Sequence, residues 1–257
     1  MNKNILAVKS SIIFLSLFLS AFAQAQDTNG LLNKAVNFEH QFKEAEALEV
    51  YKQIASIEPS NVNALVKCTE LTCSIGARET EKSGQYKHYK IAEEFAKKAI
   101  TVDANNADAN YAMALVYGKI SRVEPDTKIA VSYVKQTKIY VDKTLAINPN
   151  HAKANYIAGM WHYKIENLSW VKKVAAKTFY SGLPKANTDS AIYYLEKCKS
   201  IQPYFAENYL YLAKAYELNR GPAKEIDVLN KLIKLPNRTY DDAAIKAEGK
   251  KMLEEMQ

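Results

Sequence analysis

Apolar residues recur at spacings of three and four positions nearly everywhere along the chain. This period places them on one face of a helix, whereas the alternation typical of half-buried strands is missing from the sequence. Glycine and proline, which interrupt helices, number only eight and seven among 257 residues. The pattern therefore predicts an all-α protein.

Four short segments repeat one local pattern, in which a helix ends, the chain turns and a second helix begins. The segments are IASIEPSNVNAL (54–65), AITVDANNADANYA (99–112), LAINPNHAKANYI (145–157) and CKSIQPYFAENYL (198–210). Their turns lie at Pro59, Ala104, Pro149 and Pro203. Proline suits such a turn because the preceding helix is complete and the missing N–H costs nothing there.

Small residues keep a fixed distance from these turns. Twelve positions before each turn the chain has Ala47, Ala92, Thr137 and Ala191. After three of the turns a small residue precedes an aromatic side chain by three positions, in the pairs Ala114 with Tyr117, Gly159 with His162, and Ala213 with Tyr216. A small residue lets two helices approach closely, and the ring fills the space beside them. The pattern is similar to the tetratricopeptide (TPR) repeat and predicts a right-handed superhelix of helix hairpins.

The turns are 45, 45 and 54 residues apart, against about 34 in a plain TPR array. Each repeat thus contains extra residues. In one repeat they predict an elongated helix over residues 126–147, after the break at Pro125. In another they fall on residues 77–88, which are polar enough to predict a loop. The third set, residues 167–187, contains Trp170 and is too apolar for a solvated linker. We expect this apolar insert to fold back on the stack.

These turns divide the chain into repeat units and a capping helix, which starts after a capping pattern at Thr239. The predicted organisation is a signal peptide over residues 1–25 and one repeat domain over 26–257, with units at about 28–61, 62–106, 107–151, 152–205 and 206–238 and a cap at 239–256.

The first residues predict export. Lys3 and Lys9 precede a run of about a dozen apolar residues, 11–22, and small residues follow at alternating positions. This is the layout of a secretory signal peptide, with cleavage after Ala23 or Ala25. The mature protein would be periplasmic or secreted in a bacterium. No later stretch reaches the roughly twenty apolar residues of a membrane helix.

Charge and chemistry-bearing residues narrow the function classes. The net charge falls from +7 to +5 without the signal peptide, and the lysines are scattered, which disfavours a nucleic-acid site. Three cysteines, an odd number, argue against a disulfide framework and are interpreted as small core residues. The four histidines have no metal-ligand spacing, and no phosphate loop or nucleophile motif is present. We therefore expect no enzyme activity and no cofactor or metal.

The remaining candidate site is the concave groove, which the first helices of TPR units line at every third or fourth position. The candidate groove residues are Tyr111, Leu115, Lys153, Tyr156, Met160, Tyr163, Leu210 and Lys214, with Trp170 from the insert beside them. Tyrosine combines a broad apolar face with a polar hydroxyl, which suits a peptide or an amphiphile. The alternative is that the insert packs on these residues and fills the groove.

A family resemblance covers residues 148–256. Leu168-Ser169-Trp170, the lysine pair that follows and Pro184 resemble the regulator-of-microtubule-dynamics family, a divergent TPR group, and Leu235-Pro236 with Asp241-Asp242 resembles its final helix. The resemblance implies a helical repeat domain without a catalytic centre. Eukaryotic members are associated with microtubules and mitochondria, and one has been assigned phospholipid binding and transfer. The secretory signal departs from their mitochondrial or membrane-anchoring N-termini.

Two functions follow as hypotheses. The first is an exported scaffold that docks a protein or peptide in the groove, because repeat arrays offer extended binding surfaces. The alternative, implied by the family resemblance and the apolar insert, is a carrier that binds phospholipid or another amphiphile.

Overall fold

All regular secondary structure in the described residues, 28–168 and 185–256 of a computed structural model, is helical. This confirms the predicted all-α fold. The helices are one over residues 28–40, then α2 (Glu44–Ile57), α3 (Val62–Ala77), α4 (Lys82–Val102), α5 (Ala107–Ile120), α6 (Thr127–Ile147), α7 (Ala152–Glu166), α9 (Thr188–Ile201), α10 (Ala206–Leu218), α11 (Pro222–Leu232) and α12 (Asp242–Glu255).

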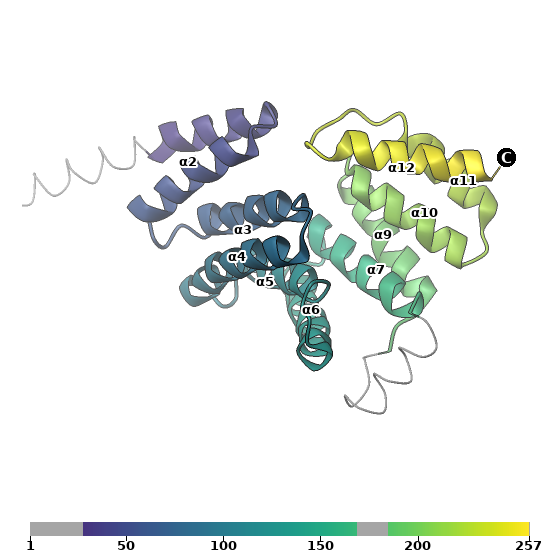
Figure 1. Ribbon diagram of the computed structural model, residues 1–257, viewed down its shortest axis with the longest axis horizontal. Coiled ribbons are helices and arrows are strands. Elements are labelled where there is room, and N and C mark those ends of the chain that lie inside the picture. The colour runs from purple at the N-terminus through teal and green to yellow at the C-terminus, as the bar shows by residue number, and fades with distance from the viewer. Residues whose placement is uncertain (1–27, 169–184, 257) are drawn as a thin grey trace, which may run out of the picture.

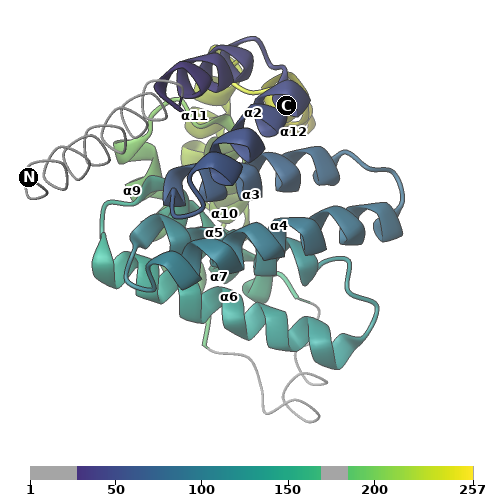
Figure 2. The ribbon, with the colours of Figure 1, turned by 90° about the vertical axis from the view of Figure 1, so that its left-hand side faces the viewer.

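The helices pack as successive hairpins that form a curved array (Figure 1). α3 pairs with α4, α5 with α6, α7 with α9, and α10 with α11. The first members α3, α5, α7 and α10 also contact one another in that order, so they form an inner row, and α4 and α6 lie outside it (Figure 2). α12 packs on α10 and α11 and covers the end of the array.

The helix starts follow from short-range sequence signals. Asn61, Asn106, Asp126, His151 and Asn187 each precede a helix, and each side chain accepts a hydrogen bond from the backbone N–H three residues later. These bonds satisfy one of the N–H groups that the first turn of a helix leaves without a partner. Three of these caps, Asn61, Asn106 and His151, lie two residues after a turn of the repeat, so the repeat itself marks where α3, α5 and α7 begin.

The small residues of the repeat lie where helices touch. Ala47, Ala92, Thr137 and Ala191 are all at most 2% exposed. At Gly159 of α7 a Cβ would lie 2.5 Å from Leu195 Cγ and 3.0 Å from the Ala191 carbonyl oxygen on α9. Only glycine allows this approach, which is why the repeat has its smallest residue there.

A second repeated feature, which the sequence analysis did not interpret, is a buried asparagine on the inner helices. Asn110, Asn155 and Asn208 are fully buried, and each donates to a backbone carbonyl. Asn155 Nδ2, for example, donates to the carbonyls of Pro149 and His151, at 3.1 and 3.0 Å. The asparagines tie α5, α7 and α10 each to the turn or helix that precedes it.

The predicted loop over residues 77–88 is wrong, because α4 begins at Lys82. Both α4 and the predicted long helix α6 have 21 residues. The two repeats whose turns are 45 residues apart are about 11 residues longer than a plain TPR unit. In both, the extra residues lengthen the second helix by about three turns. The polar composition suggested a loop because only a narrow face of this part of α4 packs against the protein, so most of its side chains are polar. Gly76 lies against His88, where an added Cβ would come within 2.5 Å, so α3 accepts the early turns of α4.

The array curves far enough for its two ends to touch. Arg78, between α3 and α4, binds Asp241 just before α12, with 3.0 Å between Nη1 and Oδ2, and also binds Glu44 at the start of α2. Its guanidinium lies 4.6 Å from the centroid of the Tyr240 ring. In Figure 1 the loop before α12 reaches toward the N-terminal helices.

Three earlier predictions concern residues outside those described: the signal peptide (1–25), most of the apolar insert (167–187) and Trp170. No helix among residues 28–168 and 185–256 has the length and apolar character that a membrane crossing requires.

Candidate functional site

The candidate groove residues lie on the inner row of helices. Leu115 on α5, Met160 on α7 and Lys214 on α10 occupy equivalent positions in successive repeats. We call the side of α5, α7 and α10 that carries these three residues the inner surface.

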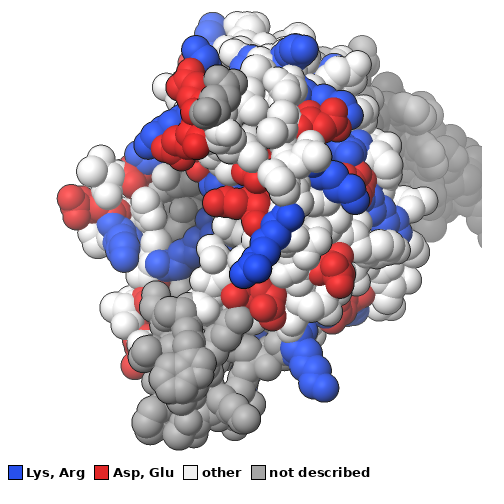
Figure 3. All heavy atoms as spheres, turned by 90° about the vertical axis from the view of Figure 1, so that its right-hand side faces the viewer, with Lys and Arg blue, Asp and Glu red and all other residues white. Residues whose placement is uncertain are grey.

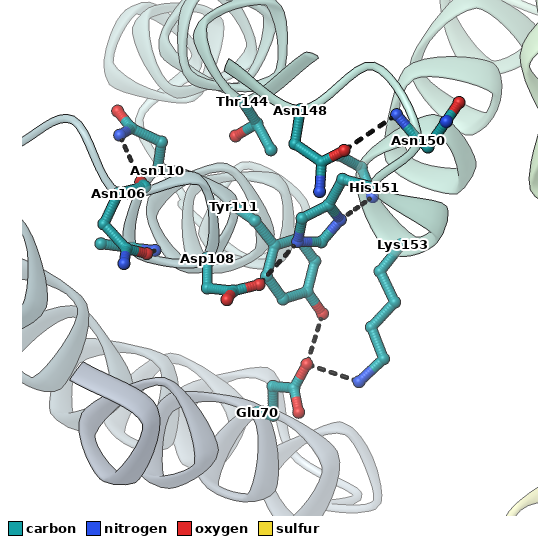
Figure 4. Close-up of polar contacts among 12 residues, drawn as sticks. Glu70, Asn106, Asp108, Asn110, Tyr111, Thr144, Asn148, Asn150, His151 and Lys153 are labelled. Carbon is teal, nitrogen blue, oxygen red and sulfur yellow. Dashed lines mark hydrogen bonds and ion pairs between the residues drawn. The ribbon is translucent and has the colours of Figure 1, made fainter. Parts of the chain in front are cut away.

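One end of the inner surface is occupied by a polar network around Glu70 of α3 (Figure 4). The Tyr111 hydroxyl donates to Glu70 Oε1 at 2.8 Å, and Lys153 Nζ lies 2.6 Å from the same oxygen. Lys67 Nζ lies 3.9 Å from the other oxygen. Burial alone would raise the pKa of Glu70, but Lys153, Lys67 and the two hydrogen bonds lower it. The charged carboxylate thus ties α3 to α5 and α7.

His151 and Asp108 extend this network. His151 Nε2 lies 3.0 Å from Asp108 Oδ1, and the His151 ring lies 4.8 Å from the Tyr111 ring, centroid to centroid. Figure 4 shows these side chains converging from α5 and the start of α7. Tyr111 and Lys153, two predicted groove residues, are therefore already engaged within the chain.

The middle of the inner surface is an aromatic cluster. Tyr156 packs edge-on against Phe205 and Tyr211, with centroids 4.9 and 5.8 Å apart, and Tyr163 meets Tyr211 at 5.9 Å. Burial, followed by the negative charge of Glu207, raises the pKa of the Tyr156 hydroxyl far above its ordinary range. These rings join α7 to α10.

Exposure divides the predicted groove residues into two groups. Tyr111, Tyr156, Met160 and Leu210 are buried, with 3–8% of their surface exposed. Leu115, Lys153, Tyr163 and Lys214 are half-buried and present part of each side chain outward. A ligand on the inner surface would therefore meet chiefly the second group. The assignment of these residues to a ligand stays a prediction.

A cavity of about 40 Å³ opens beside the aromatic cluster, between α5, α7 and α10. Its walls include Leu115, Tyr156 and Met160, together with three charged side chains, Lys119, Arg122 and Glu207. Arg122 Nη2 donates to Met160 Sδ at 2.9 Å. The cavity thus combines apolar walls with charged groups at its edge.

Lys164, in the last turn of α7, lies near the charged residues of this cavity. Burial lowers the pKa of its ammonium to about 7, and Arg122, Lys119 and Lys214 act in the same direction, whereas Glu207 opposes them. Lys164 and Lys214 lie over the Tyr211 ring, at 5.6 and 5.4 Å from its centroid. Positive charge therefore gathers around Tyr211.

The groove prediction missed Lys119, Arg122, Lys164 and Tyr211. The rule of every third or fourth position stopped before the last turn of each helix, where Lys119 and Lys164 lie. A signal was present, because both lysines follow the repeat's ring residue, Tyr117 or His162, by two positions.

Other reactive groups of the described chain are shielded. Burial raises the pKa of the Cys68, Cys73 and Cys198 thiols to about 12, so they are protonated at neutral pH and weak nucleophiles. They are unpaired and buried, as predicted. His162 packs against the rings of Trp161 and Tyr194. Residues 28–168 and 185–256 contain no group of three or more His, Cys, Asp or Glu side chains that could hold a metal ion.

The solved structures include a thermophilic TPR protein from Thermus thermophilus with a similar fold. The two superpose with a TM-score of 0.64 over 86% of this chain and 98% of the other, at 14% sequence identity. Identity at this level shows the fold alone, and it confirms the predicted array of TPR-like hairpins.

Two of the sequence relatives are animal proteins. A Caenorhabditis elegans protein, regulator of microtubule dynamics protein 1, is 33% identical over 88 residues, which are 34% of this chain and 39% of the worm protein. The Mus musculus regulator of microtubule dynamics protein 2 is 32% identical over 87 residues, 34% of this chain and 21% of that protein.

The family profile described as regulator of microtubule dynamics protein 1-3 matches residues 31–257, a much longer span than either pairwise match. It includes the repeats before residue 148 as well as the segment that carries the resemblance. The chain therefore belongs to the regulator of microtubule dynamics protein 1-3 family.

Proposed function

We propose that this protein is a non-catalytic, exported scaffold that docks a segment of another protein on its inner surface. The observation that carries the proposal is the combination of half-buried Tyr163 and Tyr211 with lysine and arginine side chains on the inner row of a TPR array. Tyrosine and arginine are enriched where proteins bind one another, because they offer apolar area together with polar groups.

Site-specific photo-crosslinking tests this docking. A photoreactive phenylalanine analogue replaces Tyr163 on the inner surface or, as a matched control, Tyr193, which is 60% exposed on α9. We expect a discrete crosslinked protein from the cell at position 163 and none at position 193. Equal crosslinking at the two positions, or none above background, would contradict docking on the inner surface.

Export is supported by the residue pattern at the start of the chain, with Lys3 and Lys9 before an apolar run. We expect the protein isolated from its native host to begin at Gln24 or Gln26, following cleavage after Ala23 or Ala25. N-terminal sequencing checks this. A mature protein that still begins at Met1 would show that the segment is retained.

Phospholipid binding is the alternative function. The cavity beside Tyr156 measures about 40 Å³, which has room for a small polar group and not for an acyl chain, so this cavity suits a peptide side chain better than a lipid tail. Organic extraction and mass spectrometry of the purified protein separate the two functions. A stoichiometric lipid in the extract would favour the carrier.

The relatives' role in microtubule dynamics is not carried over to this chain. The matched part of this chain spans only 39% of the length of the worm relative and 21% of the mouse relative.

A further inference from the structure

The inner surface carries a group of cations with one acid, Glu207, beside them and no ion-pair partner within the described residues. Lys119, Arg122 and Lys164 form no ion pair among residues 28–168 and 185–256. Lys214, which shares the Tyr211 ring with Lys164, is paired with Glu248 at 2.5 Å. The opposing acid Glu207 lines the same cavity and also raises the pKa of Tyr156. We call Lys119, Arg122 and Lys164 the cation cluster.

The arrangement of the cluster is costly for the chain alone. Three like charges lie near one another, and Lys164 is largely withdrawn from water, which disfavours its charged form. On the face toward the C-terminal helices, by contrast, acids and bases are interspersed (Figure 3). The insert residues 169–184 contain three lysines and no acid, so their charge cannot neutralise the cluster. An anion from another molecule would relieve this repulsion.

We propose that the cation cluster is an anion-binding subsite, which receives a carboxylate of an acidic segment of the docked protein. The inference rests on the proposed scaffold function and deepens it by naming the chemistry of the partner. Arg122 offers a planar donor pair that matches a carboxylate, and the two lysines add positive charge from α5 and α7. The cavity of about 40 Å³ beside Arg122 accommodates a group of carboxylate size, and Tyr211 provides an apolar face next to it.

A direct binding measurement tests the subsite. The probe is a fluorescein-labelled, N-acetylated and C-amidated octapeptide of alternating leucine and glutamate, and its glutamine counterpart controls for charge. We expect the glutamate peptide to bind the full chain at least about tenfold more tightly than the glutamine peptide. The Arg122→Gln/Lys164→Gln variant should lose this preference, while Lys251→Gln, at an exposed lysine on α12, should keep it. Equal affinity of the two peptides for the unaltered protein would overturn the proposal.

Two competition experiments distinguish a peptide carboxylate from other sources of the anion. Inorganic phosphate should compete only weakly, because it lacks the apolar side chains of the peptide. Vesicles containing anionic phosphatidylglycerol should not displace the peptide. Displacement by the vesicles would assign the cluster to a lipid surface and overturn the peptide assignment.

The subsite and the scaffold function can fail separately. If the Tyr163 crosslink forms equally well in the Arg122→Gln/Lys164→Gln variant, docking stands and the subsite is wrong. If Tyr163 yields no crosslink but the glutamate peptide still binds through the cluster, the subsite stands and the proposed docking on the aromatic cluster is wrong.

Discussion

Glu70 keeps a negative charge inside the array because two lysines and a tyrosine surround it. Only 15% of its side chain is exposed, and its partners Tyr111 and Lys153 lie 41 and 83 residues away in the sequence. A carboxylate in such a place is stable only while these partners remain, because an unpaired buried charge is costly. At the scale of single residues, this network therefore fixes one end of the inner surface.

Replacement of Glu70 by glutamine should therefore change how stability depends on pH. The folded state lowers the pKa of Glu70 below its usual value of 4.5. Its contribution is then complete above pH 4.5 and is lost as the pH falls through the lower folded pKa. We expect Glu70→Gln to reduce the free energy of unfolding at pH 7 by about 1–2 kcal/mol and to flatten its decline at acidic pH.

Urea unfolding at pH values between 3 and 7 measures this effect. Glu49→Gln is the matched control, because Glu49 is 67% exposed in its pair with Lys52 and such pairs contribute little. Parallel acid profiles for Glu70→Gln and the unaltered protein would contradict the assigned role of Glu70.

At the scale of helices, the pairing of α7 with α9 depends on the missing side chain of Gly159. Leu195 of α9 is fully buried and occupies the space that a Cβ at Gly159 would need. Gly118 of α5 shows the contrast, because the nearest atom to its Cβ position, Thr137 Cγ2, is 3.6 Å away, an ordinary contact.

Alanine at these two glycines should therefore act in opposite directions. Gly159→Ala forces Leu195 and the backbone near Ala191 to move, which we expect to cost about 1–3 kcal/mol of stability. Gly118→Ala should leave stability unchanged or raise it by up to about 1 kcal/mol, because alanine favours a helix. Thermal and urea unfolding of both variants check this, and an equal effect of the two substitutions would refute the close approach.

At the scale of the whole molecule, one arginine joins the two ends of the array. Arg78 binds Asp241 across a sequence separation of 163 residues and also binds Glu44 and the Tyr240 ring. Exposed ion pairs contribute roughly 0–1 kcal/mol, so these contacts are better suited to setting curvature than to holding the fold together.

Arg78→Gln should accordingly open the array without unfolding it. We expect a larger radius of gyration in small-angle X-ray scattering, with an unfolding midpoint close to that of the unaltered protein. High salt should expand the unaltered protein in the same way, because about 1 M salt screens charges beyond roughly 3 Å. Lys251→Gln, which removes a pair within α12, should change neither quantity. An unchanged radius in Arg78→Gln would show that packing alone sets the curvature.

Most of the fold could be predicted because its signals are short-range. The helical periodicity, the turns between helices (such as the one at Pro149) and the small residues at a fixed distance from each turn all depend on a few neighbouring positions. The loop predicted over residues 77–88 was wrong because polar composition cannot reveal that one face of α4 packs on Gly76 of α3. Of the site, the sequence supplied three of the tyrosines together with Lys153 and Lys214, but neither Tyr211 nor the partners that already engage the two lysines.

The sequence by itself determined most of the helices, their hairpin pairing and the family. The tertiary structure alone decided that Arg78 meets Asp241 and that Lys164 lies near Lys119 and Arg122, which line one cavity. The reason is that curvature accumulates over several helix pairs. Small differences in helix length and packing angle therefore decide which distant side chains meet. A short sequence pattern cannot predict the combined effect of these differences.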